Sequence, residues 1–468
     1  MNNKILSQSI KSILLILCSI VTSSGSDTLT LDAYLEIIGE NYPLIQKAEL
    51  FDAFAEAYIQ LGRGALDPKV NSGYKKKRFE DKNYYSVWQS ELKIPTIFPI
   101  DFSVGYERND GQFLNSENSV PQLGLFYGTF NVSLLRGLMF DDQRYKVQSA
   151  ELKGIKSQID KDILVREIIF QAIITYLDWA AAYNKNEIIQ AYLNSLQDRH
   201  LNIIQLFENG DKPAIDTVES KVYLNTATKD FLLAKNELNI KTQKLSLFLW
   251  SDENTPLEIN DTTVIPESIS SLMDQMEDFA SIDNLSLLND PSIRKFENEV
   301  DQLRLKNKLV KENLKPRLDL KYNTIVRAGD QTFGPTLDLN DYKYGLNVEV
   351  PIRNRKTKSS LRLNEILIEQ TTLEQRQYYQ QLLNKFEMLL ISKSVQEDIV
   401  DVTNEKIDNS QTLFQAEDLK FNLGESSVFL LNQREQKLLQ ARYELVKSLK
   451  SLGITLAELY YLKLGQLN

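Results

Sequence analysis

The sequence has very few side chains of the kinds that bind zinc or carry out nucleophilic catalysis. It holds one cysteine and one histidine among 468 residues. Cys18 lies in an apolar N-terminal stretch, and His200 stands alone in a helix-favouring segment, so the usual cysteine and histidine zinc sites are excluded. His200 is interpreted as a solvated or groove-lining helix residue. No phosphate-binding loop and no Gly-x-Ser-x-Gly motif occurs, so the sequence predicts no enzyme, no catalytic or metal site and no cofactor.

The chain also lacks a surplus of positive charge. Its 54 lysines and arginines stand against 64 aspartates and glutamates, a formal net charge of −10. Proteins that bind nucleic acid need basic side chains to neutralise phosphates. The composition therefore argues against a nucleic-acid partner.

Long apolar runs are missing as well. After residue 26 no stretch approaches the ~18 apolar residues of a transmembrane helix. Residues 1–26 combine Lys4 and Lys11 with a short apolar run and a tail of small residues, which is typical of a secretory signal peptide. Leu17 precedes Cys18 where a lipid-attachment site needs a small residue. We expect an exported protein without a helical membrane anchor.

The sequence does contain a long internal repeat. "NYPLIQKAEL" (41–50) resembles "NDPSIRKFEN" (289–298), and a second proline follows 25 residues after the first one in both copies. "FENG" ends at Gly210 and "FNLG" ends at Gly424, 214 residues later. The ordered matches predict two homologous repeats. We place them at 27–250 and 281–468, with a polar, turn-rich linker over 251–280.

Each repeat reads as a helix, strands, a long helix, a turn and another long helix. The strands are expected within 69–136 and 317–351, where apolar and polar residues alternate with period two. The helical hairpins are expected over 141–250 and 355–465. Their apolar residues recur at steps of three and four, a narrow stripe typical of coiled coils. The predicted fold is mainly α, with antiparallel coiled-coil helices and an added β region.

The predicted strands have about the ~9–11 residues that a tilted strand needs to cross a bilayer. They are rich in aromatic residues, and the candidates for contact with outer-membrane lipid are Tyr85, Trp88, Phe102, Tyr106, Tyr342 and Tyr344. A half-buried soluble sheet would alternate in the same way. The export signal, the absence of cysteine after residue 26 and the aromatic residues favour a membrane β-barrel.

A barrel in a bilayer can have no free strand edge. Two strands per repeat give four per chain, which is too few for a barrel, so several chains would have to share one. The basic run "RNRKTKSSLR" (353–362) directly follows the last strand and is interpreted as a juxtamembrane segment.

Four stretches resemble one known family. They are "LTLDAYLEIIGENYPLIQKAEL" (29–50), "LKPRLDLKY" (314–322), "YGLNVEVPIRNRKTKSSLRLNE" (344–365) and "FNLGESSVFLLNQREQKLLQARYEL" (421–445). In their order and duplication, over essentially the whole chain after residue 26, they resemble the TolC-like outer-membrane efflux and secretion channels.

The resemblance implies a homotrimer. Three chains would contribute four strands each to a twelve-stranded outer-membrane β-barrel, which continues as an α-helical tunnel in the periplasm. The tunnel would meet a periplasmic adaptor and an inner-membrane transporter of the resistance-nodulation-division (RND), ABC or major-facilitator (MFS) type. Drugs, small molecules or proteins would then pass passively to the exterior. A soluble periplasmic coiled-coil scaffold is the alternative.

The resemblance also suggests functional residues. The turns at Gly210 and at Leu423 and Gly424 would be adaptor-docking sites. Asp216 and Glu219 occupy positions at which acidic residues of the family ring the periplasmic entrance, whereas the second repeat has Leu430 and Gln433 there. Asp216 could instead only support the start of the helix that follows Pro213.

The first strand region departs from the family pattern. From Pro68 to Gly137 there are 69 residues, but from Pro316 to Pro351 there are only 35. The surplus of about 34 residues predicts an extra hairpin or a long extracellular loop, and it puts the count of two strands per repeat in question.

Overall fold

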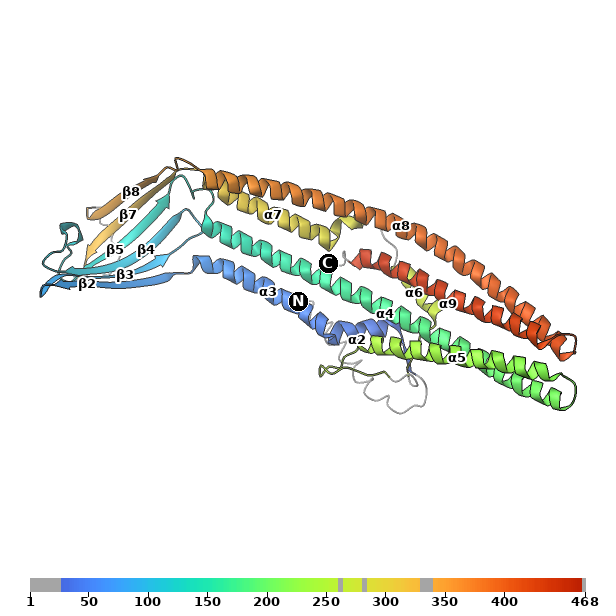
Figure 1. Cartoon of the computed structure of the whole chain (residues 1–468). Helices are drawn as coiled ribbons and strands as arrows, with labels where there is room; N and C mark the ends of the chain where they lie inside the picture. Colours follow the sequence, from blue (N-terminus) through green and yellow to red (C-terminus); the bar gives the residue numbers. More distant parts are fainter. Residues whose placement is uncertain (1–26, 260–263, 280–283, 329–339, 465–468) are drawn as a thin grey trace, which may run out of the picture. The chain divides into compact units, whose positions relative to one another are not determined.

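The computed structural model describes residues 27–259, 264–279, 284–328 and 340–464, so the predicted signal peptide lies outside the described residues (Figure 1). The chain divides into two compact units. The sheet unit contains residues 49–163 and 288–382. The hairpin unit contains residues 1–48, 164–287 and 383–468.

Three helices have residues in both units. They are α3 (Pro43–Arg63), α4 (Asp142–Glu208) and α8 (Arg355–Asn422). Among the described residues, no helix combines the length and the apolarity needed to cross a membrane.

The sheet unit holds one antiparallel sheet of six strands, in the order β2-β3-β4-β5-β7-β8 (Figure 1). The strands are β2 (Lys69–Phe79), β3 (Lys82–Ile94), β4 (Ile100–Asp110), β5 (Leu125–Ser133), β7 (Arg317–Arg327) and β8 (Tyr342–Glu349). The first repeat therefore contributes four strands and the second two. The prediction of four strands per chain was wrong. A barrel of twelve strands from three chains depended on that number, so it is not supported either.

The surplus residues of the first repeat form an additional hairpin, β2–β3. Its turn is closed by Glu80 and Asp81, which both have positive φ, 49° and 54°. Two consecutive residues of positive φ match the twist of the flanking strands and favour a two-residue hairpin turn. Of the two explanations for the surplus, the extra hairpin is the one that the structure shows.

The register gives this sheet one apolar and one polar face. Val70 lies opposite Leu92, and Leu92 lies opposite Val104. Because side chains alternate along a strand, the even-numbered residues share one face up to the register shift after Lys77, and the odd-numbered residues share the other. The even face is mostly apolar. Its charged members are Lys76, Arg108 and Asp110, at the strand ends remote from α4 and α8.

Helices α3, α4, α7 (Pro291–Glu312) and α8 supply the helical part of the sheet unit. Asp290 caps α7 by accepting a 2.8 Å hydrogen bond from the amide of Ser292. Lys295 on α7 forms a 3.0 Å ion pair with Asp160 on α4. Such contacts fix α7 beside α4. Short 3₁₀ turns lie at Gly64–Leu66, Ser116–Asn118 and Asn284–Asn289.

The hairpin unit contains α2 (Leu31–Asn41), α5 (Ala214–Ser246), α6 (Ile269–Phe279), α9 (Val428–Leu464) and the parallel pair β1 (Asp27–Leu29) and β6 (Val264–Pro266). Thr30 caps α2 through a 3.2 Å bond from the amide of Ala33. The core includes Tyr34, Tyr176 and Trp179, whose successive rings lie 5.6 and 5.7 Å apart. Part of the predicted linker is thus ordered, since β6 pairs with β1 and α6 packs on α9.

Candidate functional site

The two helical hairpins end in turns with the same hydrogen bonds. After α4, the amide of Gly210 donates to the carbonyl of Phe207 (2.9 Å) and the amide of Asp211 donates to that of Leu206 (2.8 Å). After α8, the amide of Gly424 donates to Phe421 (3.0 Å) and the amide of Glu425 to Lys420 (2.8 Å). This pair of bonds defines a Schellman motif, which satisfies the last carbonyls of a helix.

A Schellman motif needs a left-handed residue, and glycine supplies it without a Cβ clash. The φ angles are +85° at Gly210 and +78° at Gly424. A Cβ built at either glycine would have no neighbour within 4 Å. The backbone conformation, and not crowding inside the chain, therefore selects glycine at both turns.

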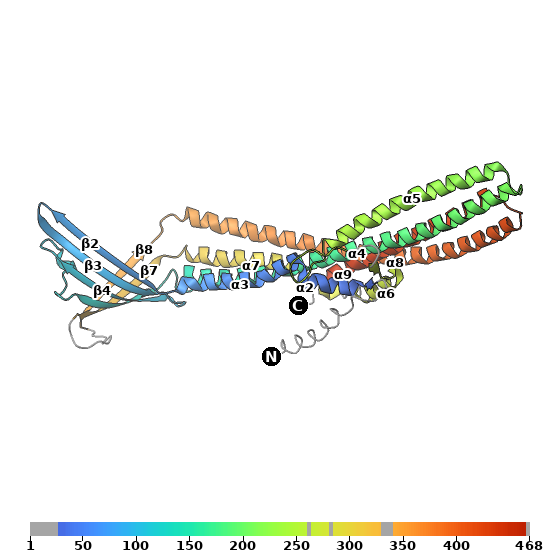
Figure 2. The same ribbon diagram turned by 90° about the horizontal axis from the view of Figure 1, so that it is seen from below.

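The two turns lie side by side in the hairpin unit, at the same end of the hairpins in both views (Figures 1 and 2). Lys212, just after the first turn, places its Nζ atom 4.8 Å from the centre of the Phe421 ring at the end of α8. A cation above an aromatic face is attracted to it. The predicted docking residues Gly210, Leu423 and Gly424 thus form one exposed surface.

Asp216 and Glu219 lie on the first two turns of α5, three residues apart and therefore on the same side of the helix. Both side chains are partly exposed. Burial, and then the neighbouring carboxylate of Asp216, raises the pKa of Glu219. The structure brings the acid pair together, and Asp216 stands in the first helical turn, where a negative charge also favours the helix N-terminus.

The starts of α5 and α9 differ in the way they are capped. Pro213 precedes α5 and makes no side-chain cap. Ser427 precedes α9, and its hydroxyl accepts a 3.3 Å bond from the amide of Leu430. The position of Asp216 in the first repeat is taken by Leu430 in the second. The start of α5 therefore has an acidic residue in its first turn, whereas the start of α9 has a serine hydroxyl that accepts a hydrogen bond.

A buried polar network ties α4 to α9 close to the turns. Arg199 donates from Nη1 to Oε2 of Glu435 (2.6 Å) and to Oδ1 of Asn432 (2.7 Å). Ser195 donates to the other carboxylate oxygen at 2.7 Å. The Arg199 and Glu435 side chains are only 10 % and 8 % exposed. Sequence reasoning missed this network, because charged residues on a charged helix are usually solvated.

Five of the six aromatic candidates share the apolar face of the sheet. Trp88 and Tyr106 meet edge to face at 5.6 Å, and Tyr342 and Tyr344 lie 6.1 Å apart. Phe102 contacts Phe130 across the neighbouring strand at 5.3 Å. Tyr85 does not join them. It pairs with Lys77 and so belongs to the polar face.

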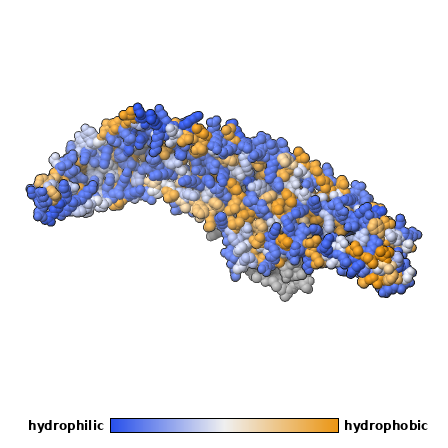
Figure 3. All heavy atoms as spheres, in the orientation of Figure 1, coloured by the Kyte–Doolittle hydropathy of each residue, from blue (hydrophilic) through white to orange (hydrophobic). Residues whose placement is uncertain are grey.

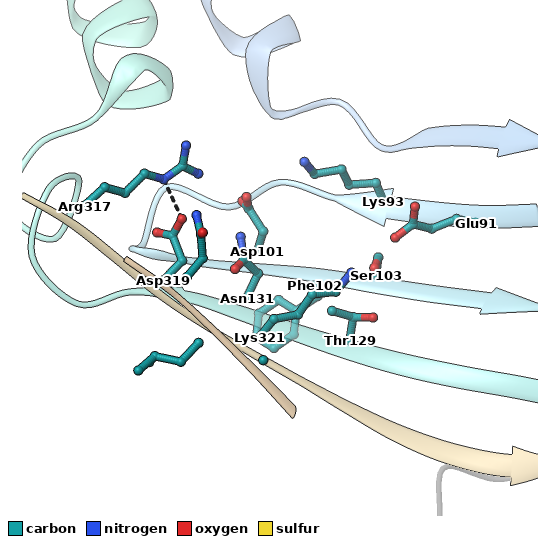
Figure 4. A pocket seen from close by; sticks show the side chains of 13 residues that line it. Glu91, Lys93, Asp101, Phe102, Ser103, Thr129, Asn131, Arg317, Asp319 and Lys321 are labelled. Carbon is teal, nitrogen blue, oxygen red and sulfur yellow. Dashed lines mark hydrogen bonds and ion pairs between the residues drawn. The ribbon is translucent and has the colours of Figure 1, made fainter. Parts of the chain in front are cut away.

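The polar face contains a hollow of about 460 Å³ (Figure 4). Its wall brings together residues from β3, β4, β5, β7 and β8. The charged side chains that line it are Glu91, Lys93, Asp101, Arg317, Asp319 and Lys321. Arg317 forms an ion pair with Asp319, drawn as the dashed line in Figure 4. An enclosed apolar ligand pocket would be lined differently, so the hollow is better described as part of a water-facing wall.

The lone histidine lies on α4 and contacts α5. Nδ1 of His200 is 2.7 Å from the Ser220 hydroxyl. Burial, and then the positive charge of Lys221, lowers the pKa of His200. Within the described ranges there is no group of three or more histidine, cysteine or acidic residues that could hold a metal ion.

The basic run 353–362 connects the sheet to α8. Arg355 begins the helix, three residues after the exposed Ile352. Arg362 lies 3.7 Å from Glu365 in the following turn. The remainder of the run is largely exposed, and its role at a membrane surface stays a prediction.

Comparison with known proteins agrees with this architecture. Residues 284–463 match the family model described as outer membrane efflux protein. No curated protein matches the sequence. The CmeC outer membrane channel of Campylobacter jejuni is 11 % identical, with a TM-score of 0.65 over 93 % of this chain and 86 % of that chain. VceC of Vibrio cholerae is 12 % identical, with a TM-score of 0.63 over 92 % and 95 %.

The open state of the MtrE outer membrane channel of Neisseria gonorrhoeae is also similar, at 13 % identity and a TM-score of 0.63 over 93 % of this chain and 88 % of that chain. At such identities these structures establish the fold. Helical hairpins joined to a two-faced sheet are thus the fold of outer-membrane channels. Residues 284–463, most of the second repeat, thus match the outer membrane efflux protein family, in agreement with the resemblance seen in the sequence.

Proposed function

We propose that three copies of this chain form a passive outer-membrane duct, the exit component of a tripartite efflux pump or a type I secretion system. Drugs, small molecules or proteins would reach it from a periplasmic adaptor and an inner-membrane transporter of the RND, ABC or MFS type. The observation that carries the proposal is the sheet with one apolar and one polar face. Membrane barrels turn such an apolar face to lipid and the polar face to a lumen.

The edges of the sheet support assembly from several copies. Among the described residues, β2 pairs only with β3, and β8 pairs only with β7. Unpaired strand edges are not tolerated in a bilayer. Because an antiparallel sheet of six strands has oppositely directed edge strands, β8 of one copy can pair antiparallel with β2 of the next. Three copies with six strands each would give an eighteen-stranded barrel.

The helices also carry apolar surface that the single chain does not cover (Figure 3). The exposed apolar residues on α8 include Met388, Ile391, Val395, Ile399 and Val402, spaced by three or four residues. Those on α5 include Ile215, Val218 and Val222, with the same spacing. Stripes of this kind bury themselves against neighbouring helices. They support side-by-side packing of copies, and the family resemblance favours three.

A matched pair of arginine substitutions tests the lipid-facing side. Leu346→Arg puts a charge on the apolar face, while Asn347→Arg puts it on the polar face of the same strand. A lipid-facing arginine costs about 2–4 kcal/mol near the middle of the bilayer. We expect Leu346→Arg to lower the amount of folded protein in the outer-membrane fraction severalfold and Asn347→Arg to leave it unchanged.

The same fractionation separates the duct from the alternative, a soluble periplasmic scaffold. Recovery of the unmodified chain only in the soluble periplasmic fraction would exclude the duct. Equal effects of the two arginines would show that the apolar face does not contact lipid.

We further propose that the acid pair lies at the periplasmic entrance. Asp216 and Glu219 in three copies would bring six carboxylates close together, and crowded acidic groups attract cations and repel anions. The raised pKa of Glu219 supports mutual repulsion of this kind already within one chain.

Neutralising the pair tests the entrance. We expect Asp216→Asn with Glu219→Gln to weaken cation block and cation selectivity in single-channel recordings, because the fixed negative charge is lost. Gln433→Ala, at the matching position of the second repeat, is the control and should change neither property. Unchanged conductance, block and selectivity in the double variant would leave Asp216 with only its role at the helix start.

Acidification should reproduce the double variant in the unmodified channel. Because the folded protein holds the pKa of Glu219 above its ordinary value, Glu219 takes up its proton at a higher pH than a free glutamate. Cation selectivity should therefore begin to fall at that higher pH as the solution is acidified. Asp216→Asn removes the neighbouring charge and should move this transition to lower pH.

A further inference from the structure

We propose that the polar face of the sheet attracts anions, and that the additional hairpin β2–β3 is what gives it this property. This preference is a property of the wall of the sheet alone, separate from the effect proposed for the acid pair on α5. The inference rests on the proposed channel, in which the polar face becomes the wall of the lumen, and it goes beyond it by naming a charge class for that wall.

The charges of the six strands are unequal on this face. Its odd-numbered positions carry eight basic side chains and five acidic ones. The basic residues are Lys69, Lys75, Lys77, Lys93, Arg317, Lys321, Arg327 and Lys343, and the acidic residues are Glu91, Asp101, Glu107, Asp319 and Glu349. The whole chain, in contrast, has a formal net charge of −10. This face thus carries a net positive charge on a protein whose total charge is negative.

The surplus comes entirely from the additional hairpin. Strands β4, β5, β7 and β8 contribute four basic and four acidic residues to the polar face, which cancel. Strands β2 and β3 contribute four lysines and one acid, Glu91. A sheet without the hairpin would have a neutral polar face, so the added strands change its charge as well as its width.

The pairing within the hairpin also points to an anionic partner. Lys69 lies directly opposite Lys93 in the register, on the same face. Like charges in opposed positions destabilise a strand pair. Anions in the lumen would relieve that repulsion. Lys93 also lines the hollow described above, where the basic residues Lys93, Arg317 and Lys321 are matched by three acidic ones, so the surplus of positive charge lies with the other lysines of the hairpin (Figure 4).

Part of the remaining charge is neutralised in place. Arg317 is paired with Asp319, and Glu349 lies 3.9 Å from Arg136. These ion pairs neutralise charged side chains on β7 and β8, which are not part of the additional hairpin. In a narrow aqueous space with walls of low dielectric constant, a net fixed charge raises the local concentration of counter-ions. The lysines of β2 and β3 are therefore the groups expected to set the preference of this wall.

Ion selectivity of the purified full chain in a planar lipid bilayer tests the proposal. We measure the reversal potential in a potassium chloride gradient for the unmodified protein and for Lys69→Gln with Lys75→Gln. Removal of six positive charges per trimer should lower the chloride-to-potassium permeability ratio about twofold. Lys69→Arg with Lys75→Arg keeps the charge and should keep the ratio.

The matched control is Lys76→Gln, which removes a lysine from the other face of the same strand. It should leave the ratio unchanged. An equal fall in Lys76→Gln, or no fall in the double glutamine variant, would overturn the inference while the channel itself stands. Absence of any channel from the unmodified protein would instead contradict the proposed function.

Discussion

Glu435→Ala is expected to lower the free energy of unfolding of the hairpin unit by about 3–5 kcal/mol, the largest loss of stability that we predict for a single substitution. Arg199 donates to Glu435 at 2.6 Å, and its side chain is only 10 % exposed. Without the carboxylate, the buried guanidinium is left with its bonds to Asn432 and Ser195 among the described residues. An uncompensated buried charge is costly because the lost hydration is no longer offset. Loss of helical circular dichroism on heating provides the measurement.

Two further variants separate this cause from the loss of packing. Glu435→Gln keeps an acceptor for Arg199 and should cost clearly less than alanine. Replacing both partners, with Arg199→Met and Glu435→Leu, removes the charge problem and should restore most of the lost stability, as apolar replacements of buried ion pairs often do. If the double variant unfolds as readily as Glu435→Ala, the uncompensated charge is not the cause.

The network also explains why the two hairpins of the repeats lie together at their turns. Leu193 and Leu196 on α4 pack on Ala227 of α5, within the first hairpin. Ser195 and Arg199, on another side of α4, reach α9 of the second hairpin. Apolar packing thus holds the first hairpin closed, while a specific polar contact joins it to the second hairpin.

The parts of the fold that depend on local pattern could be predicted from the sequence. Thr30, a threonine directly before a segment with helical periodicity, is a typical helix cap, and it caps α2. A glycine that ends a long helix at a tight turn is typical of a residue with positive φ, and Gly210 and Gly424 both have it. Each of these features is decided by a few neighbouring residues, so one sequence suffices.

Strand β2 could not be predicted in the same way. It contains four consecutive basic residues, Lys75 to Arg78, and each of its residues is exposed in the single chain. Its strand conformation comes from its pairing with β3, from Lys69 opposite Lys93 to Phe79 opposite Lys82. The consecutive basic residues of this edge strand interrupt the alternation of apolar and polar residues that marks a strand. In the sequence, only the surplus length of the first strand region indicated an additional hairpin.

The Arg199–Glu435 contact depends on residues 236 positions apart. Each residue looks like any other charged position of a long helix, and periodicity does not say which of them are buried. For the acid pair, in contrast, the sequence identifies the residues but their role cannot be read from one chain. The sequence identifies Asp216 and Glu219 by their distance from Gly210, and the structure places them together on α5, yet their function depends on neighbouring copies of the chain.

Replacing both turn glycines by valine is expected to abolish export while the assembled channel persists. Gly210 and Gly424 have positive φ, which costs an L-residue roughly 1–2 kcal/mol and suits a β-branched residue least. A Cβ atom added at either position would have no neighbour within 4 Å, so the change should distort the exposed turns and spare the helices behind them. Export is followed as intracellular accumulation of the cargo, and assembly as the native mass of the purified protein.

Asparagine at the same two positions separates conformation from contact. It tolerates the left-handed region much better than valine, so the turns should keep their Schellman hydrogen bonds. If the adaptor grips the turn conformation, Gly210→Asn with Gly424→Asn should export normally. If it needs the bare backbone surface, the asparagine variant should fail as completely as the valine variant. Normal export by the valine variant would contradict docking at these turns, and loss of assembly would assign the glycines to the architecture of the channel instead.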